Sequence, residues 1–140
     1  MNICMMTNTY LPHVGGVARS VSTFAEEYRK RRHRVLVVAP EFEGKPLSPR
    51  AAAIIQRVPA IQNFNGSDFS VQLPLISTPD RLEAFKPDIV HAHHPFLLGD
   101  TALRYAATKN APVIFTHHTR YEDYTHYVPF DSPALKEMAI

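Results

Sequence analysis

The stretch IFTHHTRYEDYTHY, residues 114–127, continues an apolar run that begins at Val113 and stops abruptly at His117 and His118. Tyrosines, acidic residues and another histidine follow, with almost no aliphatic residues among them. The stretch DIVHAHHP, residues 88–95, shows the same change from apolar to polar. In open α/β sheets, binding sites lie in the crevice beyond the carboxyl ends of the strands. The two stretches therefore predict buried strands whose ends form part of a binding cleft, together with a Gly-Gly loop near the N-terminus.

The rest of the chain alternates between apolar runs of strand length and segments of helical periodicity. Strands are predicted at Ile3–Met6, Val35–Ala39, Ile54–Val58, Ser70–Leu73, Ile89–Ala92 and Val113–Thr116, and helices from Val17, Ser77, Leu98 and Ser132 onward. A turn is expected at Asn65-Gly66, and a surface loop at Glu41–Arg50. This order of elements predicts an α/β fold with a parallel sheet covered by helices. The length of 140 residues suits a single domain over residues 1–140.

Composition fits a soluble globular domain and argues against several other classes. The chain is 45% hydrophobic and 20% charged, and its net charge of +2 is too small to indicate a nucleic-acid partner. The one cysteine, Cys4, suits a reducing cytoplasm. Met1 leads directly into a core strand, so no signal peptide is expected. No apolar run approaches the roughly 20 residues of a membrane span, so membrane contact would be peripheral.

Gly15 and Gly16 lie between the first strand and the first helix. Glycine lets the backbone approach a ligand closely, and a helix N-terminus offers free N–H groups to a phosphate. The alternative is a turn that merely needs a positive φ. The pattern is not GxGxxG, so a nicotinamide cofactor is not supported, and the Lys-Ser/Thr pair of a P-loop is missing.

The histidines allow several interpretations. His91 and His93 are two apart on a predicted strand and therefore share a face. With His118 they could build the metal site of a hydrolase, but no carboxylate or cysteine lies beside them at ligand spacing. A histidine at a strand end could instead donate hydrogen bonds to a polar substrate. For His91 and His117 a structural role is at least as well supported.

Residues 29–34, RKRRHR, form the strongest charge run. They come at the end of the first helix, where cations complement the helix dipole. A solvated helix end is favoured over a patch that binds an anionic membrane.

Three tyrosines, Tyr121, Tyr124 and Tyr127, are spaced three apart, as are Asp123 and His126. They could be an aromatic cover over the sheet end. Alternatively, they form a mixed aromatic and polar surface that suits a carbohydrate or a lipid head group.

Three motifs in order, YLPHVGGV (residues 10–17), PDIVHAHHPF (87–96) and THHT (116–119), resemble the N-terminal domain of family 4 glycosyltransferases. The resemblance runs from residue 1 to about residue 129. Residues 121–127, YEDYTHY, are similar to the branch that glycosylates diacylglycerol and related lipids.

The resemblance implies a GT-B fold, in which two Rossmann-like domains face each other across a cleft. This chain would be the N-terminal half, with helices on both faces of its sheet. The implied reaction is retaining sugar transfer from a nucleotide-sugar donor to a lipid or saccharide acceptor, with no essential metal and no cofactor. It also implies residue roles: the donor diphosphate near Gly15 and Gly16, the transferring sugar at His118 as the catalytic residue, and the acceptor near Tyr10, His94, Tyr121, Asp123, Tyr124 and His126.

Two departures from the family pattern matter. Arg32 stands where the family has a glycine after the first helix, so a local difference in the helix end is expected. The C-terminal domain, with its nucleotide pocket and cationic residues, is absent from these 140 residues. We therefore expect a cytoplasmic protein piece, peripheral to the inner membrane face and inactive alone. The alternatives are a metal-dependent hydrolase using His91, His93 and His118, and a non-enzymatic module that binds a lipid or sugar.

Overall fold

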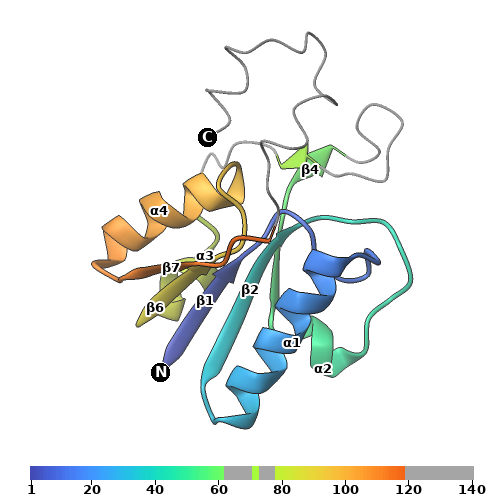
Figure 1. The fold of residues 1–140 in the computed structure, drawn as a ribbon, viewed down its shortest axis with the longest axis horizontal. Helices are drawn as coiled ribbons and strands as arrows, with labels where there is room; N and C mark the ends of the chain where they lie inside the picture. The colour runs from blue at the N-terminus through green and yellow to red at the C-terminus, as the bar shows by residue number, and fades with distance from the viewer. Residues whose placement is uncertain (62–70, 73–77, 119–140) are drawn as a thin grey trace, which may run out of the picture.

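The computed structural model describes residues 1–61, 71–72 and 78–118, and its framework is one parallel sheet of five strands (Figure 1). The strand order is β3-β2-β1-β6-β7, and each neighbouring pair is parallel. A separate antiparallel pair joins β4 to β5. The bounds are β1 Asn2–Met6, β2 Arg34–Pro40, β3 Ile55–Val58, β4 Ala60–Ile61, β5 Val71–Gln72, β6 Ile89–Ala92 and β7 Val113–Phe115.

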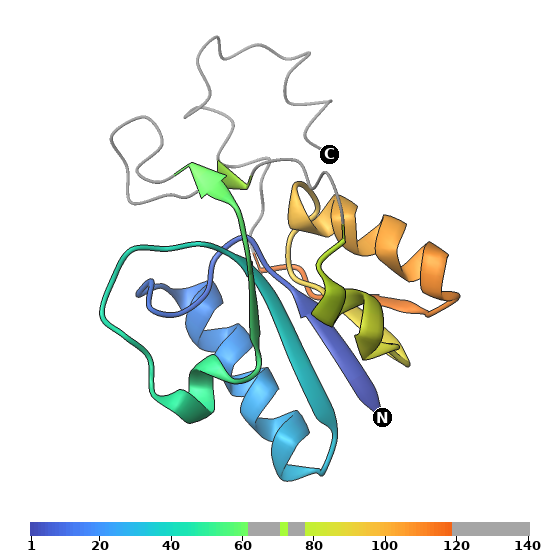
Figure 2. The ribbon, with the colours of Figure 1, turned by 180° about the vertical axis from the view of Figure 1, so that it is seen from behind.

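Helices cover both faces of this sheet (Figures 1 and 2). Alternate residues of β1 point to opposite faces, so Ile3 and Met5 pack with α1 while Cys4 and Met6 pack with α3 and α4. All four side chains are buried, as expected of a central strand in a parallel sheet. The predicted α/β class is therefore confirmed. The helices are α1 Gly16–Lys30, α2 Pro49–Ala52, α3 Asp80–Phe85 and α4 Leu98–Lys109.

The periodicity of α1 is confirmed in its packing. Val21 and Ala25 are buried, and Val17, Phe24 and Tyr28 pack against the same core cluster. This stripe fixes α1 on β1 and β2.

The largest differences from the sequence predictions lie in short elements. The sequence predicts a helix capped by Thr78 with Pro79 in its first turn, whereas in the structure Pro79 is the N-cap and α3 begins at Asp80, one residue later. The predicted loop ends in a one-turn helix, α2, whose first backbone N–H groups are satisfied in part by Ser48, which accepts a hydrogen bond from Ala51 N at 3.3 Å. Ser48-Pro49 is a recognisable helix-start signal. The predicted turn at Asn65-Gly66 and helix from Ser132 lie outside the described residues.

The end of α1 keeps a left-handed residue although no glycine stands there. Arg32 has φ 64°, its N–H donates to Arg29 O at 2.9 Å, and His33 N donates to Tyr28 O at 3.0 Å. This pair of bonds is a Schellman motif, which satisfies carbonyls of the last helical turn. The helix therefore ends as it would with a glycine at this position, and the only local difference expected is backbone strain at Arg32.

Replacing Arg32 by glycine should therefore stabilise the chain by about 1 kcal/mol, because glycine adopts positive φ without the clash of a Cβ. Urea unfolding of the wild type and Arg32→Gly would measure the difference. The matched control is Arg31→Gly, since Arg31 has φ −82° and gains nothing from glycine. Equal or lower stability of Arg32→Gly would contradict the strain.

Candidate functional site

The candidate site lies where β1, β6 and β7 end. These strands are neighbours in the sheet, so the segments that follow them meet at one edge. Backbone bonds extend the ladder beyond the strands: His93 N donates to Met6 O at 3.1 Å, and Thr116 N donates to Ala92 O at 3.0 Å. The two histidine-rich stretches are thereby held side by side, as the sequence predicts.

His91 has a structural environment. It is 2% exposed, and its Nδ1 and Nε2 atoms lie 3.1 Å from the Tyr28 hydroxyl and 2.7 Å from Thr116 Oγ1. The Phe24 ring packs edge-on against it with centroids 5.2 Å apart. Burial lowers the pKa of His91 to about 4, so the ring is neutral at pH 7. With both ring nitrogens engaged, the structural interpretation of His91 is favoured.

His93 and His118 form a directly hydrogen-bonded pair, with His93 Nδ1 and His118 Nε2 2.9 Å apart. His93 is fully buried, and burial together with the neighbouring histidines His91, His118 and His94 lowers its pKa to about 2. Burial also lowers the pKa of His118, which is only half-buried. Two neutral imidazoles share one proton in this bond.

The unpartnered atom of the pair indicates where that proton lies. Among described residues, His93 Nε2 is buried without a hydrogen-bond partner. If His118 donated, His93 would carry its own proton on Nε2 as an orphaned buried N–H. If His93 donates from Nδ1, Nε2 is only an unpaired acceptor, which proteins tolerate better. His118 then carries its proton on Nδ1.

His94 is fixed by a residue that sequence reasoning missed. Asn8 N donates to His94 Nδ1 at 3.1 Å, and Asn8 Nδ2 donates to Phe96 O at 3.0 Å. Leu98 N, at the start of α4, donates to Asn8 Oδ1 at 2.9 Å. Asn8 therefore joins β1 to the loop after β6 and caps α4. Its place directly after the first strand was the available signal.

The loop after β6 leaves no space for a side chain at Gly99. A Cβ atom there would lie 1.7 Å from His94 O. Leu97, just before α4, has φ 56°. Close packing and a strained backbone thus hold His94, which is 7% exposed, with a pKa lowered to about 4 by burial and then by His118.

Gly15 and Gly16 begin α1 at the same edge of the sheet. Gly15 has an extended backbone, φ −171°, and neither glycine has a φ in the left-handed region. The explanation as a turn that needs positive φ is therefore wrong. A Cβ on Gly16 would meet nothing within 4 Å, and Gly15, the N-cap of α1, offers no side-chain cap. As far as residues 1–61, 71–72 and 78–118 show, the N–H groups of the first turn and the space beside Gly16 remain open.

The other predicted site residues are differently placed. Tyr10 is 4% exposed and belongs to the core cluster under α1, and burial raises its pKa. It presents little surface to an acceptor. His117 is exposed. Tyr121, Asp123, Tyr124 and His126 lie outside the described residues.

The described residues do not support the metal-hydrolase alternative. Within residues 1–61, 71–72 and 78–118, no group of three or more histidine, cysteine or acidic side chains could hold a metal ion. His93 and His118 instead bind each other. In the same ranges no helix has the length and apolar character needed to cross a membrane.

The buried histidines predict a stability that falls on mild acidification. His91, His93 and His94 have folded-state pKa values of about 4, 2 and 4, below the ordinary value of 6.5. Between pH 6.5 and 4 the unfolded chain therefore binds more protons than the folded chain, and stability falls as pH falls. Each histidine should remove about 2 kcal/mol by pH 5. Urea unfolding at pH 7.5 and 5.0 measures this loss, and His91→Gln should reduce it; equal stability at both pH values would contradict neutral burial.

The assigned tautomer gives a separate prediction. Long-range proton–nitrogen NMR at pH 7.5 should show a protonated Nδ1 and an unprotonated Nε2 in both His118 and His93. His93→Ala should remove this preference in His118, since it deletes the donor. A protonated Nε2 in wild-type His118 would refute the assignment.

Most of this chain can be matched to known proteins. The chain is 33% identical over 135 residues to an alpha-monoglucosyldiacylglycerol synthase of Streptococcus pneumoniae, covering 91% of this chain and 29% of that protein. It is 31% identical to an enzyme of the same name from Acholeplasma laidlawii, covering 91% and 32%. It is 30% identical to a GDP-mannose-dependent alpha-mannosyltransferase of Corynebacterium glutamicum, covering 85% and 29%. The chain thus spans about a third or less of the length of these relatives.

The family model of glycosyltransferase family 4 matches residues 14–139. This range includes the Gly-Gly start of α1 and both histidine-rich strands. The parallel sheet with helices on both faces agrees with the Rossmann-like N-terminal half of a GT-B fold. The chain belongs to glycosyltransferase family 4.

Proposed function

We propose that this chain is the acceptor-side domain of a retaining glycosyltransferase. The whole protein would move a sugar from a nucleotide-sugar donor to a lipid or saccharide acceptor, and the present residues would need a nucleotide-binding domain for activity. Family membership supports the reaction class, one relative's name indicates a lipid acceptor, and another's names GDP-mannose as the donor.

The observation that carries the proposal is the open N-terminus of α1. Asn8 Oδ1 accepts a hydrogen bond from Leu98 N at the start of α4, whereas no described side chain caps the first turn of α1, which begins at two glycines without positive φ. The space beside Gly16 would admit the donor diphosphate. The negative charge of the diphosphate grows as the sugar leaves. It would be stabilised by the backbone N–H groups and the positive dipole at the N-terminus of α1.

His118 would serve as a neutral hydrogen-bond donor to the transferring sugar. Its lowered pKa keeps it uncharged at pH 7, and its Nε2 is occupied by His93. The Nδ1–H is then available to a sugar hydroxyl. On this proposal His93 positions the ring, and His118 is the catalytic residue.

The acceptor site is proposed from the relatives and the sequence. Two relatives are named for a glucosylated diacylglycerol, which favours a lipid acceptor and hence a cytoplasmic protein peripheral to the inner membrane face. Tyr10 and His94 would shape the acceptor side from within the fold, and Tyr121, Asp123, Tyr124 and His126 would contact the acceptor directly.

The test uses the full-length protein containing these residues, supplied with a panel of nucleotide-sugars that includes GDP-mannose and with diacylglycerol-type lipids. We expect a glycolipid that retains the donor's anomeric configuration, and none from residues 1–140 alone. Gly16→Ala should lower donor affinity about tenfold or more, because the added methyl group occupies the space proposed for the diphosphate. Urea unfolding should show undiminished stability, because alanine is a better helix residue than glycine.

The matched control is Val14→Ala in the same loop, whose side chain is 93% exposed. It should leave donor affinity and stability unchanged. Full activity in Gly16→Ala would refute the diphosphate position, and no transfer by the full-length protein with any donor and acceptor of the panel would refute the function.

A further inference from the structure

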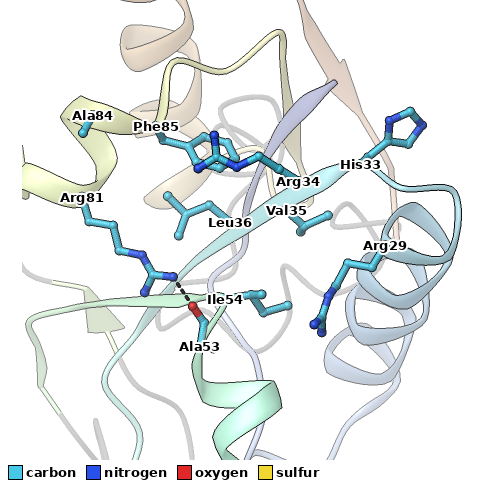
Figure 3. Close-up of a pocket in the computed structure, with 10 residues that line it drawn as sticks. All are labelled: Arg29, His33, Arg34, Val35, Leu36, Ala53, Ile54, Arg81, Ala84 and Phe85. Atoms are coloured by element: carbon cyan, nitrogen blue, oxygen red, sulfur yellow. Dashed lines mark hydrogen bonds between the residues drawn. The ribbon is translucent and has the colours of Figure 1, made fainter.

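A basic cavity lies at the opposite edge of the sheet (Figure 3). Its volume is about 470 Å³, and its polar wall consists of Arg29, His33, Arg34 and Arg81. Leu36 and Phe85 contribute apolar surface. No carboxylate is among the described residues that line it.

The cavity is separate from the candidate active site. Arg34 is the first residue of β2, and the cavity also contacts residues just before β3 and the last residue of α3. It therefore lies at the amino ends of the strands, whereas His118 and Gly16 lie beyond the carboxyl ends. β2 has seven residues. At about 3.3 Å per residue, the two edges are about 20 Å apart.

Within the described residues, none of the three arginines takes part in a salt bridge, so no acidic side chain of that part of the chain balances their charge. Arg81 donates to the carbonyl oxygens of Ala53 and Ile55, which orient its guanidinium without neutralising it. Arg34 lies over the Phe85 ring, 5.6 Å from its centroid. Two of the three cations are thus held in place before any ligand arrives.

Helix dipoles explain only one of these charges. Arg29 lies in the last turn of α1, where a cation is favourable. Arg81 lies in the first turn of α3, where a cation is unfavourable, and Arg34 belongs to a strand. The acidic residues of that turn, Asp80 and Glu83, do not line the cavity, and Glu83 pairs with Lys109 at 2.5 Å.

We propose that the basic cavity is a second ligand site, which binds a phosphate group. Planar guanidinium groups match phosphate oxygens in pairs, and the apolar floor accommodates the carbon atoms of a phosphate ester. The phosphate belongs to a small phosphorylated molecule or to the head group of an anionic phospholipid. This site is additional to the donor diphosphate position at Gly16.

The first arm of the test titrates inorganic phosphate into the 140-residue chain at pH 7.5. Arginine Nε–H signals of Arg29, Arg34 and Arg81 should shift and saturate in proton–nitrogen NMR. The double variant Arg29→Gln/Arg34→Gln should bind at least about tenfold more weakly, because two charge-assisted contacts are lost. Arg29→Gln alone serves if the double variant unfolds, since Arg29 anchors no backbone group among the hydrogen bonds described.

The control variant Arg104→Gln/Lys45→Gln removes the same charge from exposed positions elsewhere. The second arm sediments the wild type and both variants with vesicles of phosphatidylglycerol or of phosphatidylcholine. Saturable phosphate binding that only the cavity variant loses identifies a small phosphorylated ligand. Binding to phosphatidylglycerol vesicles alone, lost only in that variant, identifies a lipid head group. No binding in either arm, or equal loss in the control variant, overturns the site.

Discussion

The burial of β1 on both faces is the constraint from which the site follows. Its neighbours β2 and β6 pair with it in parallel, and the two helical layers exclude water from both sides. Because a shift by one residue would exchange side chains of different size between two closely packed layers, the residues after the strand are fixed in height relative to β6. Asn8, which follows β1, forms hydrogen bonds with His94, Phe96 and Leu98. These bonds position the loop after β6 and satisfy the first N–H group of α4.

The same burial determines the chemistry of the histidines. A charged imidazole would lose hydration that the apolar layers cannot replace, so His91, His93 and His94 have pKa values far below 6.5. Neutral rings can each donate one hydrogen bond and accept one. In the proposed function, a neutral His118 would orient a sugar hydroxyl through the ring nitrogen that is not bonded to His93. Transition-state charge would then be stabilised by backbone N–H groups, helix dipoles and cations outside these residues.

Sequence periodicity was sufficient to locate the strands of the sheet, because its central strands are continuous apolar runs and α1 has a clear stripe. It also located the histidines at strand ends, because they come where the apolar runs stop. The predicted burial of the last strand is wrong: β7 is an edge strand, and its Ile114 and Phe115 are 48% and 46% exposed. Periodicity could not give the hydrogen-bond partners of Asn8 or Tyr28, since these are 63 to 90 residues away and no local pattern records such contacts. It left two explanations of Gly15 and Gly16 open, because spacing does not distinguish a glycine needed for φ from one needed for space. At Arg32 the packing of α1 imposed a left-handed backbone on a residue that disfavours it.

The two edges of a parallel α/β sheet need different chemistry to bind the same anion. Crossover helices point their N-termini toward the carboxyl ends of the strands, so N–H groups and positive dipole are available there without any cationic side chain. At the amino ends of the strands the helices present carbonyl groups and negative dipole, and only side chains can attract a phosphate. Glycines begin α1 at the first edge, whereas Arg29, Arg34 and Arg81 surround the cavity at the second. The favourable interaction of cations with the C-terminal end of α1 explains only the arginine on α1. It does not explain the arginines contributed by β2 and α3, whereas a phosphate-binding site explains all three.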